Sequence, residues 1–312
     1  MSERVKIGVA GAGSMGKHHA RVLASLPAAH LTAIYDLDET RAREMAAQYG
    51  AQPFQDLKEF AAAVDAAVVA VPTAAHREVA GILLEQKKHV LVEKPLTESL
   101  HEAQELVGLA EKQNVVLQVG HIERFNPVMA SLEERIREPR FIEATRLSPF
   151  PNRSMDIGVV LDLMIHDLEI ILHLVRSPIV SVDAVGVPVL TRREDIANAR
   201  LRFANGCVAN VTASRVSDKK MRKIQVFHTA GYISLDYQEQ SGHSYRRDGM
   251  QIVREEVPVE KDDSLTRELA AFVDCARHGA APLVSGQQGA DALHLAIQIT
   301  ELITQAPSAS PR

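Results

Sequence analysis

Short apolar segments alternate with helical segments along the first 120 residues or so of the chain. The apolar segments are rich in β-branched residues and read as strands buried on both faces. Alternation of this kind predicts a doubly wound parallel sheet, with ligands bound at the carboxyl ends of its strands. The expected strands are Val5–Ala10, Leu31–Tyr35, Ala66–Val71, His89–Val92 and Val115–Val119, and the expected helices are Lys17–Leu26, Glu39–Tyr49, Leu57–Ala63, His76–Gln86 and Ser99–Lys112.

The pattern changes beyond about residue 140, where hairpin signals replace the alternation. Asn205-Gly206 separates two apolar segments, and Ala230-Gly231 separates the next two. Such turns favour antiparallel pairing. We therefore expect a smaller α+β domain with a mostly antiparallel, open sheet, covered on one face by the helix Asp156–Val175. Its strands are expected at Val180–Leu190, Asn198–Phe203, Cys207–Arg215, Lys223–His228, Tyr232–Tyr237 and Gln251–Val259, with closing helices at Leu265–Arg277 and Gly289–Ile303. The predicted domains are residues 1–120 and 121–312.

Composition narrows the class of protein. The 312 residues carry a net charge of −5 with dispersed basic residues, so we expect neither a nucleic-acid partner nor an anionic membrane surface. No apolar stretch approaches the roughly 20 residues that span a bilayer. The two cysteines, Cys207 and Cys275, are too few for a structural zinc site and indicate buried thiols. The first strand leaves no room for a signal peptide, and a cytoplasmic protein is expected.

A glycine-rich turn follows the first strand. In Gly11-Ala12-Gly13-Ser14-Met15-Gly16, the first glycine permits a tight turn and the second allows close approach of a pyrophosphate. The third allows the helix to pack on the strand, and the helix N-terminus offers amide donors to an anion. Asp36 ends the second strand, where it would bind ribose hydroxyls and repel a 2'-phosphate. This arrangement predicts binding of NAD rather than NADP.

Two further turns leave strand ends on the same side of the sheet. Pro72 and Thr73 follow one strand, with His76 shortly after, and Glu93 and Lys94 follow another. Because the strands are parallel, these turns are expected to converge on the cofactor crevice. His76 either lines the cofactor site or simply begins a helix, and Glu93 is expected to orient nucleotide or backbone.

The helix Asp156–Val175 is apolar nearly all round and therefore expected to be buried. At about 100° per residue, one stripe nevertheless collects ionisable groups, and buried ionisable groups need partners. The stripe consists of Gly158, Asp162, His166, Glu169 and His173. Asp162 and His166 are interpreted as catalytic, whereas Glu169 and His173 are interpreted as structural. No metal site is predicted, because a nicotinamide pocket already accounts for an acid–base pair.

Five motifs in order resemble the glucose-fructose oxidoreductase, inositol dehydrogenase and rhizopine-catabolism family, abbreviated Gfo/Idh/MocA. They are the glycine turn, Val71-Pro72-Thr73 with His76, Glu93-Lys94-Pro95, the junction Gly120–Pro127, and Asp162-Leu163-Met164-Ile165-His166. One difference from many members is Gly158-Val159-Val160, where they carry paired glycines before the aspartate.

The resemblance implies hydride transfer from a secondary hydroxyl of a sugar or polyol to NAD. It implies that His166 is the general base, because imidazole exchanges protons near neutrality. Lys94 would hold the reacting oxygen and Asp162 would bind the substrate hydroxyl. It also implies a cis bond before Pro95 and a homodimer or homotetramer formed through the open sheet face, where Val182, Ala184, Val208 and Val211 could supply apolar contacts.

Residues 121–127 and 159–168 most resemble the branch that oxidises the 3-hydroxyl of UDP-N-acetylglucosamine. The alternatives are an inositol or free-sugar dehydrogenase, and a non-catalytic sensor of NAD or sugar. Arg124 is either a substrate contact or a structural ion at the domain junction. A basic cluster in the second domain either holds a diphosphate or forms solvated strand ends, with Arg153 taken as a substrate contact. The cluster comprises Arg146, Arg153, Arg215, Lys219, Lys220 and Arg222.

Overall fold

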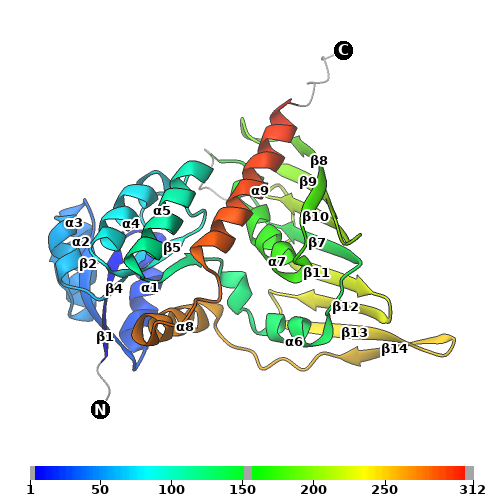
Figure 1. The fold of residues 1–312 in the computed structure, drawn as a ribbon, viewed down its shortest axis with the longest axis horizontal. Helices are drawn as coiled ribbons and strands as arrows, with labels where there is room; N and C mark the ends of the chain where they lie inside the picture. Colours follow the sequence, from blue (N-terminus) through cyan, green and yellow to red (C-terminus); the bar gives the residue numbers. More distant parts are fainter. Residues whose placement is uncertain (1–3, 151–156, 306–312) are drawn as a thin grey trace. The chain divides into compact units, whose positions relative to one another are not determined.

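The computed structural model describes residues 4–150 and 157–305, and these form two compact units. The first unit joins residues 1–125 to 263–293, and the second joins 126–262 to 294–312. Figure 1 shows the elements of each unit. Within the described ranges, none of the helices is long and apolar enough to cross a bilayer.

A six-stranded parallel sheet forms the centre of the first unit. Its order is β3-β2-β1-β4-β5-β6, in which the direction of winding reverses between β1 and β4. Ligands of doubly wound sheets bind at this reversal, beyond the carboxyl ends of the strands. The strands are β1 (Val5–Ala10), β2 (Ala29–Tyr35), β3 (Gln52–Phe54), β4 (Ala66–Val69), β5 (His89–Glu93) and β6 (Leu117–Gly120). The predicted sheet is confirmed, with β3 added as a short edge strand.

Helices cover both faces of this sheet. The helices are α1 (Ser14–Ser25), α2 (Glu39–Tyr49), α3 (Leu57–Ala62), α4 (His76–Glu85), α5 (Leu100–Gln113) and α8 (Ser264–His278). One buried core joins β1 and β2 to α1, α2 and α8. Leu269 and Phe272 of α8 are fully buried in this core.

The return of α8 changes the expected domain boundaries. The boundary predicted at residue 120 lies five residues before the end of the first segment at Phe125. Residues 263–293, however, belong to the first unit, although the sequence analysis placed them in the second. The apolar face of α8 is buried against α1 and β1, and this contact between distant segments leaves no local signal in the sequence.

An eight-stranded sheet forms the second unit, in the order β14-β13-β12-β11-β7-β10-β9-β8. Only the β7–β10 pair is parallel, so the expected mostly antiparallel sheet is confirmed. The strands are β7 (Phe141–Leu147), β8 (Ile179–Val187), β9 (Ile196–Phe203), β10 (Val208–Ser214), β11 (Met221–His228), β12 (Gly231–Asp236), β13 (Ser241–Asp248) and β14 (Gln251–Glu256). The strands β7 and β13 were not predicted from the sequence.

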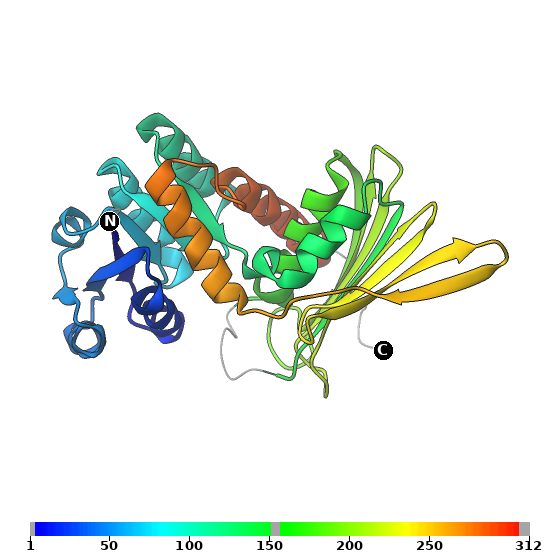
Figure 2. The ribbon, with the colours of Figure 1, turned by 90° about the horizontal axis from the view of Figure 1, so that it is seen from below.

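Helices of the second unit lie on one face of this sheet, as Figure 2 shows. They are α6 (Pro127–Arg135), a π-helical turn (Val160–Met164), α7 (Ile165–Val175) and α9 (Gly286–Gln305), of which residues from His294 onward belong to this unit. The other face carries exposed valines, including Val185 and Val187. Val208 alternates with buried neighbours and fits the open face. Val211 is fully buried on the helix side, and Val182 and Ala184 pair with Leu201 and Ala199 on that same side, which corrects the prediction for these three residues.

Candidate active site

The glycine turn lies at the carboxyl end of β1, where three glycines meet different demands. Gly11 has φ +105°, and a side chain there would meet the backbone of Ala70. A Cβ at Gly16 would lie 1.7 Å from the Gly11 carbonyl oxygen, so only glycine lets α1 pack on the turn. At Gly13, by contrast, an added Cβ would meet nothing within 4 Å beyond the adjoining backbone. The open space beside the first amides of α1 fits a pyrophosphate.

Asp36 lies directly beside this turn. Its Oδ2 accepts a hydrogen bond from the Ala12 amide at 2.7 Å, and its Oδ1 accepts one from the Asp38 amide at 2.8 Å. These bonds hold the carboxylate at the end of β2, next to the turn. The arrangement fits the predicted role of an acid that recognises a ribose at the switch point.

His76 connects the two other turns at this edge of the sheet. Its Nε2 lies 2.9 Å from the Val71 carbonyl oxygen, and its Nδ1 lies 3.0 Å from that of Pro95. The Lys94-Pro95 bond is cis, as the resemblance implied. With only 1% of its surface exposed, His76 lies beneath the turns and begins α4, which matches the structural alternative. Pro72 is exposed, and Thr73 is half-buried.

Glu93 stands at the centre of a buried polar group under Lys94. Its Oε1 lies 2.7 Å from Nε2 of His19, and its Oε2 accepts the Lys94 amide at 3.3 Å. Burial acts to raise the pKa of Glu93, but the His19 hydrogen bond and the charges of His19 and Lys94 outweigh it and lower the pKa. Glu93 is therefore a carboxylate that orients backbone, as expected.

Glu268 of α8 adds a second carboxyl group to this region. Burial and the nearby Glu93 charge raise the pKa of Glu268 well above its ordinary value. Two carboxylates close together in a buried region cannot both ionise cheaply, so Glu268 holds its proton to higher pH than Glu93 does.

His121 and Arg124 follow β6 and are both buried. Burial, together with the positive charges of Lys94 and Arg124, lowers the pKa of His121 to about 3. The imidazole of His121 is therefore neutral, while Arg124 adds positive charge close to Lys94.

A π-helical turn carries Asp162 in the second unit. The amide of Ile165 donates to the Val160 carbonyl, and the wider turn precedes α7, in which His166 is the second residue. Asp162 and His166 are both half-buried. The π turn widens the residue spacing on the Asp162 side of Ile165, whereas His166, Glu169 and His173 keep ordinary helical spacing within α7. Glu169 is 2% exposed. His173 lies 2.8 Å from Glu133 of α6, which fits its structural interpretation.

A buried ion pair holds the first turn of α7 on the sheet. Arg146 of β7 donates from Nε and Nη2 to the two carboxylate oxygens of Asp167, at 2.7 and 3.1 Å. Both side chains are at most 3% exposed. Since Asp167 follows His166 directly, this pair also fixes the backbone that carries His166.

A second buried pair holds the start of the π turn. Arg215 donates to Asp195 at 2.8 Å and to the Ile157 carbonyl at 2.8 Å. Burial opposes ionisation of Asp195, but amide hydrogen bonds and Arg215 outweigh it and lower its pKa. Glu194 lies over Gly158, where a Cβ would be 1.8 Å from its carboxylate. Where many family members carry paired glycines, this chain thus carries Gly158, and the Glu194 side chain occupies the space that a Cβ at this position would fill.

Arg153 lies outside the described residues. Arg146 and Arg215 contact buried aspartates, so for these two members of the basic cluster the structural interpretation fits. The sequence does not reveal the side chains that pair with these site groups, because the two members of each pair lie 20 or more residues apart in the chain. They are His19, Asp167, Glu194, Asp195 and Glu268.

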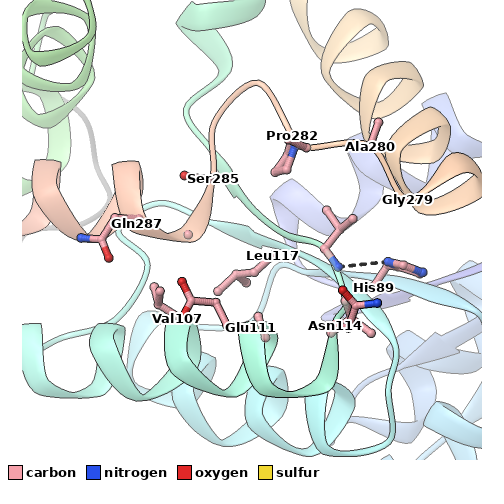
Figure 3. Close-up of a pocket in the computed structure, with 15 residues that line it drawn as sticks. His89, Val107, Glu111, Asn114, Leu117, Gly279, Ala280, Pro282, Ser285 and Gln287 are labelled. Carbon is pink, nitrogen blue, oxygen red and sulfur yellow. Dashed lines mark hydrogen bonds between the residues drawn. The ribbon is translucent and has the colours of Figure 1, made fainter. Parts of the chain in front are cut away.

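A cavity of about 380 Å³ lies at the opposite edge of the first unit's sheet. Figure 3 shows His89 and Leu117, which begin β5 and β6, beside the turn before α9. The Val116 amide donates to His89 Nδ1 at 3.1 Å. Since parallel strands start at this edge, the cavity is separate from the glycine turn.

The fold and the glycine turn together define a dinucleotide-binding oxidoreductase. Family models agree: residues 5–121 match the "Oxidoreductase family, NAD-binding Rossmann fold", and residues 132–234 match the "GFO/IDH/MocA C-terminal domain". The chain belongs to the Gfo/Idh/MocA family, and its cofactor is NAD.

Relatives of known activity cover nearly the whole chain. The UDP-N-acetylglucosamine 3-dehydrogenase of Acidithiobacillus ferrooxidans is 36% identical, over 95% of this chain and 96% of its own. Its solved structure matches with a TM-score of 0.92, over 97% of this chain and 98% of that one. The myo-inositol 2-dehydrogenase of Thermotoga maritima is 30% identical, over 93% of this chain and 94% of its own.

We expect Glu268→Gln to change how stability depends on pH. The raised pKa means that the folded state holds the proton of Glu268 more tightly than the unfolded state does. The contribution of this proton to the free energy of unfolding is therefore intact below the ordinary pKa of 4.5 and is lost as pH rises toward the folded-state pKa. The variant should gain stability relative to wild type from about pH 5 upward. Denaturant unfolding across this range measures the effect, with the exposed Glu85→Gln as control. Parallel curves for wild type and Glu268→Gln would contradict the assignment.

We expect Asp167→Asn to lower the free energy of unfolding by about 3–5 kcal/mol, because it removes the counter-charge of a buried guanidinium. Urea unfolding of the purified protein measures this loss. The exposed Asp248→Asn, in the same unit and remote from β8, is the matched control and should stay within about 0.5 kcal/mol of wild type. A loss for Asp167→Asn below about 1 kcal/mol would show that the pair does not hold α7.

Proposed function

We propose that the protein is an NAD-dependent dehydrogenase that oxidises the 3-hydroxyl of UDP-N-acetylglucosamine. The observation that carries this proposal is the combination of the NAD-binding turn with a relative of that activity, 36% identical over 95% of the chain. An inositol or free-sugar dehydrogenase is the alternative within the family, which the inositol dehydrogenase relatives support at lower identity.

Three side chains carry the chemistry in this proposal. His166 takes the proton from the substrate hydroxyl. The electron pair left on the oxygen forms the carbonyl bond as hydride leaves the same carbon. Lys94 holds the same oxygen and stabilises its developing negative charge. Asp162 accepts a hydrogen bond from the substrate and fixes its orientation. Bound NAD supplies the hydride acceptor.

The remaining predicted contacts surround these groups. Asp36 and the amides around Gly13 bind the ribose and the pyrophosphate, while Ser14, Met15, Pro72 and Thr73 line the cofactor. His76 and Glu93 support this site from beneath. Arg124 and Arg153 contact the substrate.

The buried, free thiols support a reducing compartment, and we place the protein in the cytoplasm. We also propose that it forms a homodimer or homotetramer through the open sheet face. The exposed Val180, Val185 and Val187 support this interface, since large apolar side chains gathered on a surface favour association. Cell fractionation and sedimentation equilibrium measure these two properties.

Purified protein should reduce NAD with UDP-N-acetylglucosamine at a kcat/KM at least about tenfold above that with myo-inositol or glucose, because a site built for the larger substrate gains binding energy from its remote groups. Absorbance of NADH at saturating cofactor measures the three rates. Turnover of the unactivated polyols alone would refute the nucleotide-sugar substrate and favour the alternative.

His166→Asn should lower kcat by a factor of about 10² to 10⁴ while NAD binding stays unchanged, since the variant lacks the general base. Steady-state kinetics measure kcat, and fluorescence titration with NADH measures cofactor binding. His173→Asn, on the same helix, is the matched control. Unchanged turnover in His166→Asn would remove His166 from the mechanism, whereas wild-type protein that binds NADH and turns over none of the three substrates would favour the sensor.

A further inference from the structure

One end of the second unit's sheet gathers positive charge beside the π turn. Strands β7 and β10 run parallel and end here at Leu147 and Ser214, and β11 begins here at Met221. Arg215 contacts Ile157 just before the turn. The charge comes from the basic cluster defined in the sequence, of which the structure describes Arg146, Arg215, Lys219, Lys220 and Arg222.

The described arginines of this cluster differ in their surroundings. Arg146 and Arg215 are at most 3% exposed, and each donates to a buried aspartate that balances its charge. Both of these guanidinium groups hold the catalytic helix in place. Arg222 is instead half-buried, at the second position of β11.

Strand register fixes the face on which Arg222 lies. It pairs with Arg146 across the antiparallel β7–β11 ladder, and directly opposite residues share a face. Ile224 and Val226 follow at alternate positions and are fully buried on this face, whereas Lys223 is exposed on the other. Arg222 therefore shares its face with the Arg146–Asp167 pair and α7.

We propose that Arg222 binds the diphosphate of the nucleotide-sugar substrate, an inference that rests on the proposed function. A guanidinium group matches phosphate oxygens with two parallel N–H donors, which a lysine cannot do. Lys219 and Lys220 are exposed on the adjoining turn and attract the anion from a distance.

The Arg222→Gln variant tests this role. Its KM for UDP-N-acetylglucosamine and its Kd for UDP should both rise on the order of 10- to 100-fold, because a charge-assisted, bidentate contact is lost. Its KM for NAD and its kcat at saturating sugar should stay within about twofold of wild type. Lys223→Gln removes the same charge one residue away on the opposite face and should change none of these values. Steady-state kinetics and calorimetric titration with UDP measure the constants.

Several outcomes would overturn the inference. An unchanged KM and Kd in Arg222→Gln would do so, as would equal effects of Lys223→Gln. If Arg222→Gln does not fold, Arg222→Lys takes its place, since it keeps the charge but lacks the two parallel N–H donors. Its KM for the nucleotide sugar should rise several-fold, and an unchanged KM would refute the role of Arg222. Wild-type protein that does not oxidise UDP-N-acetylglucosamine would overturn the proposed function together with this inference. Active wild-type protein with an unaffected Arg222 variant would overturn this inference alone, so the two failures are distinguishable.

Discussion

Charges removed from water must be balanced by other charges, and this constraint shapes the candidate site in both units. Isolated buried ions cost several kcal/mol each, so a buried side chain of one sign requires a partner of the other. In the first unit, the His19 hydrogen bond and the positive charge of Lys94 stabilise the Glu93 carboxylate. In the second, Asp167 and Asp195 neutralise Arg146 and Arg215 on either side of the π turn. The backbone next to the proposed catalytic residues is thus held by buried pairs that have no proposed part in the reaction.

Local patterns in the sequence were sufficient for most of the fold. Continuous apolar segments predicted five of the strands in the parallel sheet. A strand that is buried on both faces carries apolar residues at nearly every position, so it can be recognised without its neighbours. The strand β3 escaped because it is three residues long and contains Pro53. The strand β13 escaped because its composition, SGHSYRRD, is polar, and only its pairing with β12 and β14 makes it a strand.

The sequence predicted where the candidate site residues of the parallel sheet lie, but not the local backbone or the burial of every one of them. Residue types and spacing were enough to place the glycine turn, Asp36 and the cis proline turn at one edge of the sheet. They could not reveal the π turn, because a periodicity of 100° assumes an ordinary helix and because Glu194 and Arg215, which contact the start of the turn, lie far away in the chain. Nor could they show that His76 would be buried, since that depends on where two distant carbonyl groups lie.

The late return of α8 has a consequence for biosynthesis. The core of the nucleotide-binding unit includes Leu265, Leu269 and Phe272, which the ribosome adds about 140 residues after β6 is complete. At translation rates of about 5–20 residues per second, the emerging sheet waits roughly 7–30 s for the helix that covers one face of it. The nascent chain therefore exposes apolar surface for that interval, and residues 126–262 of the second unit are synthesised before the first can finish folding.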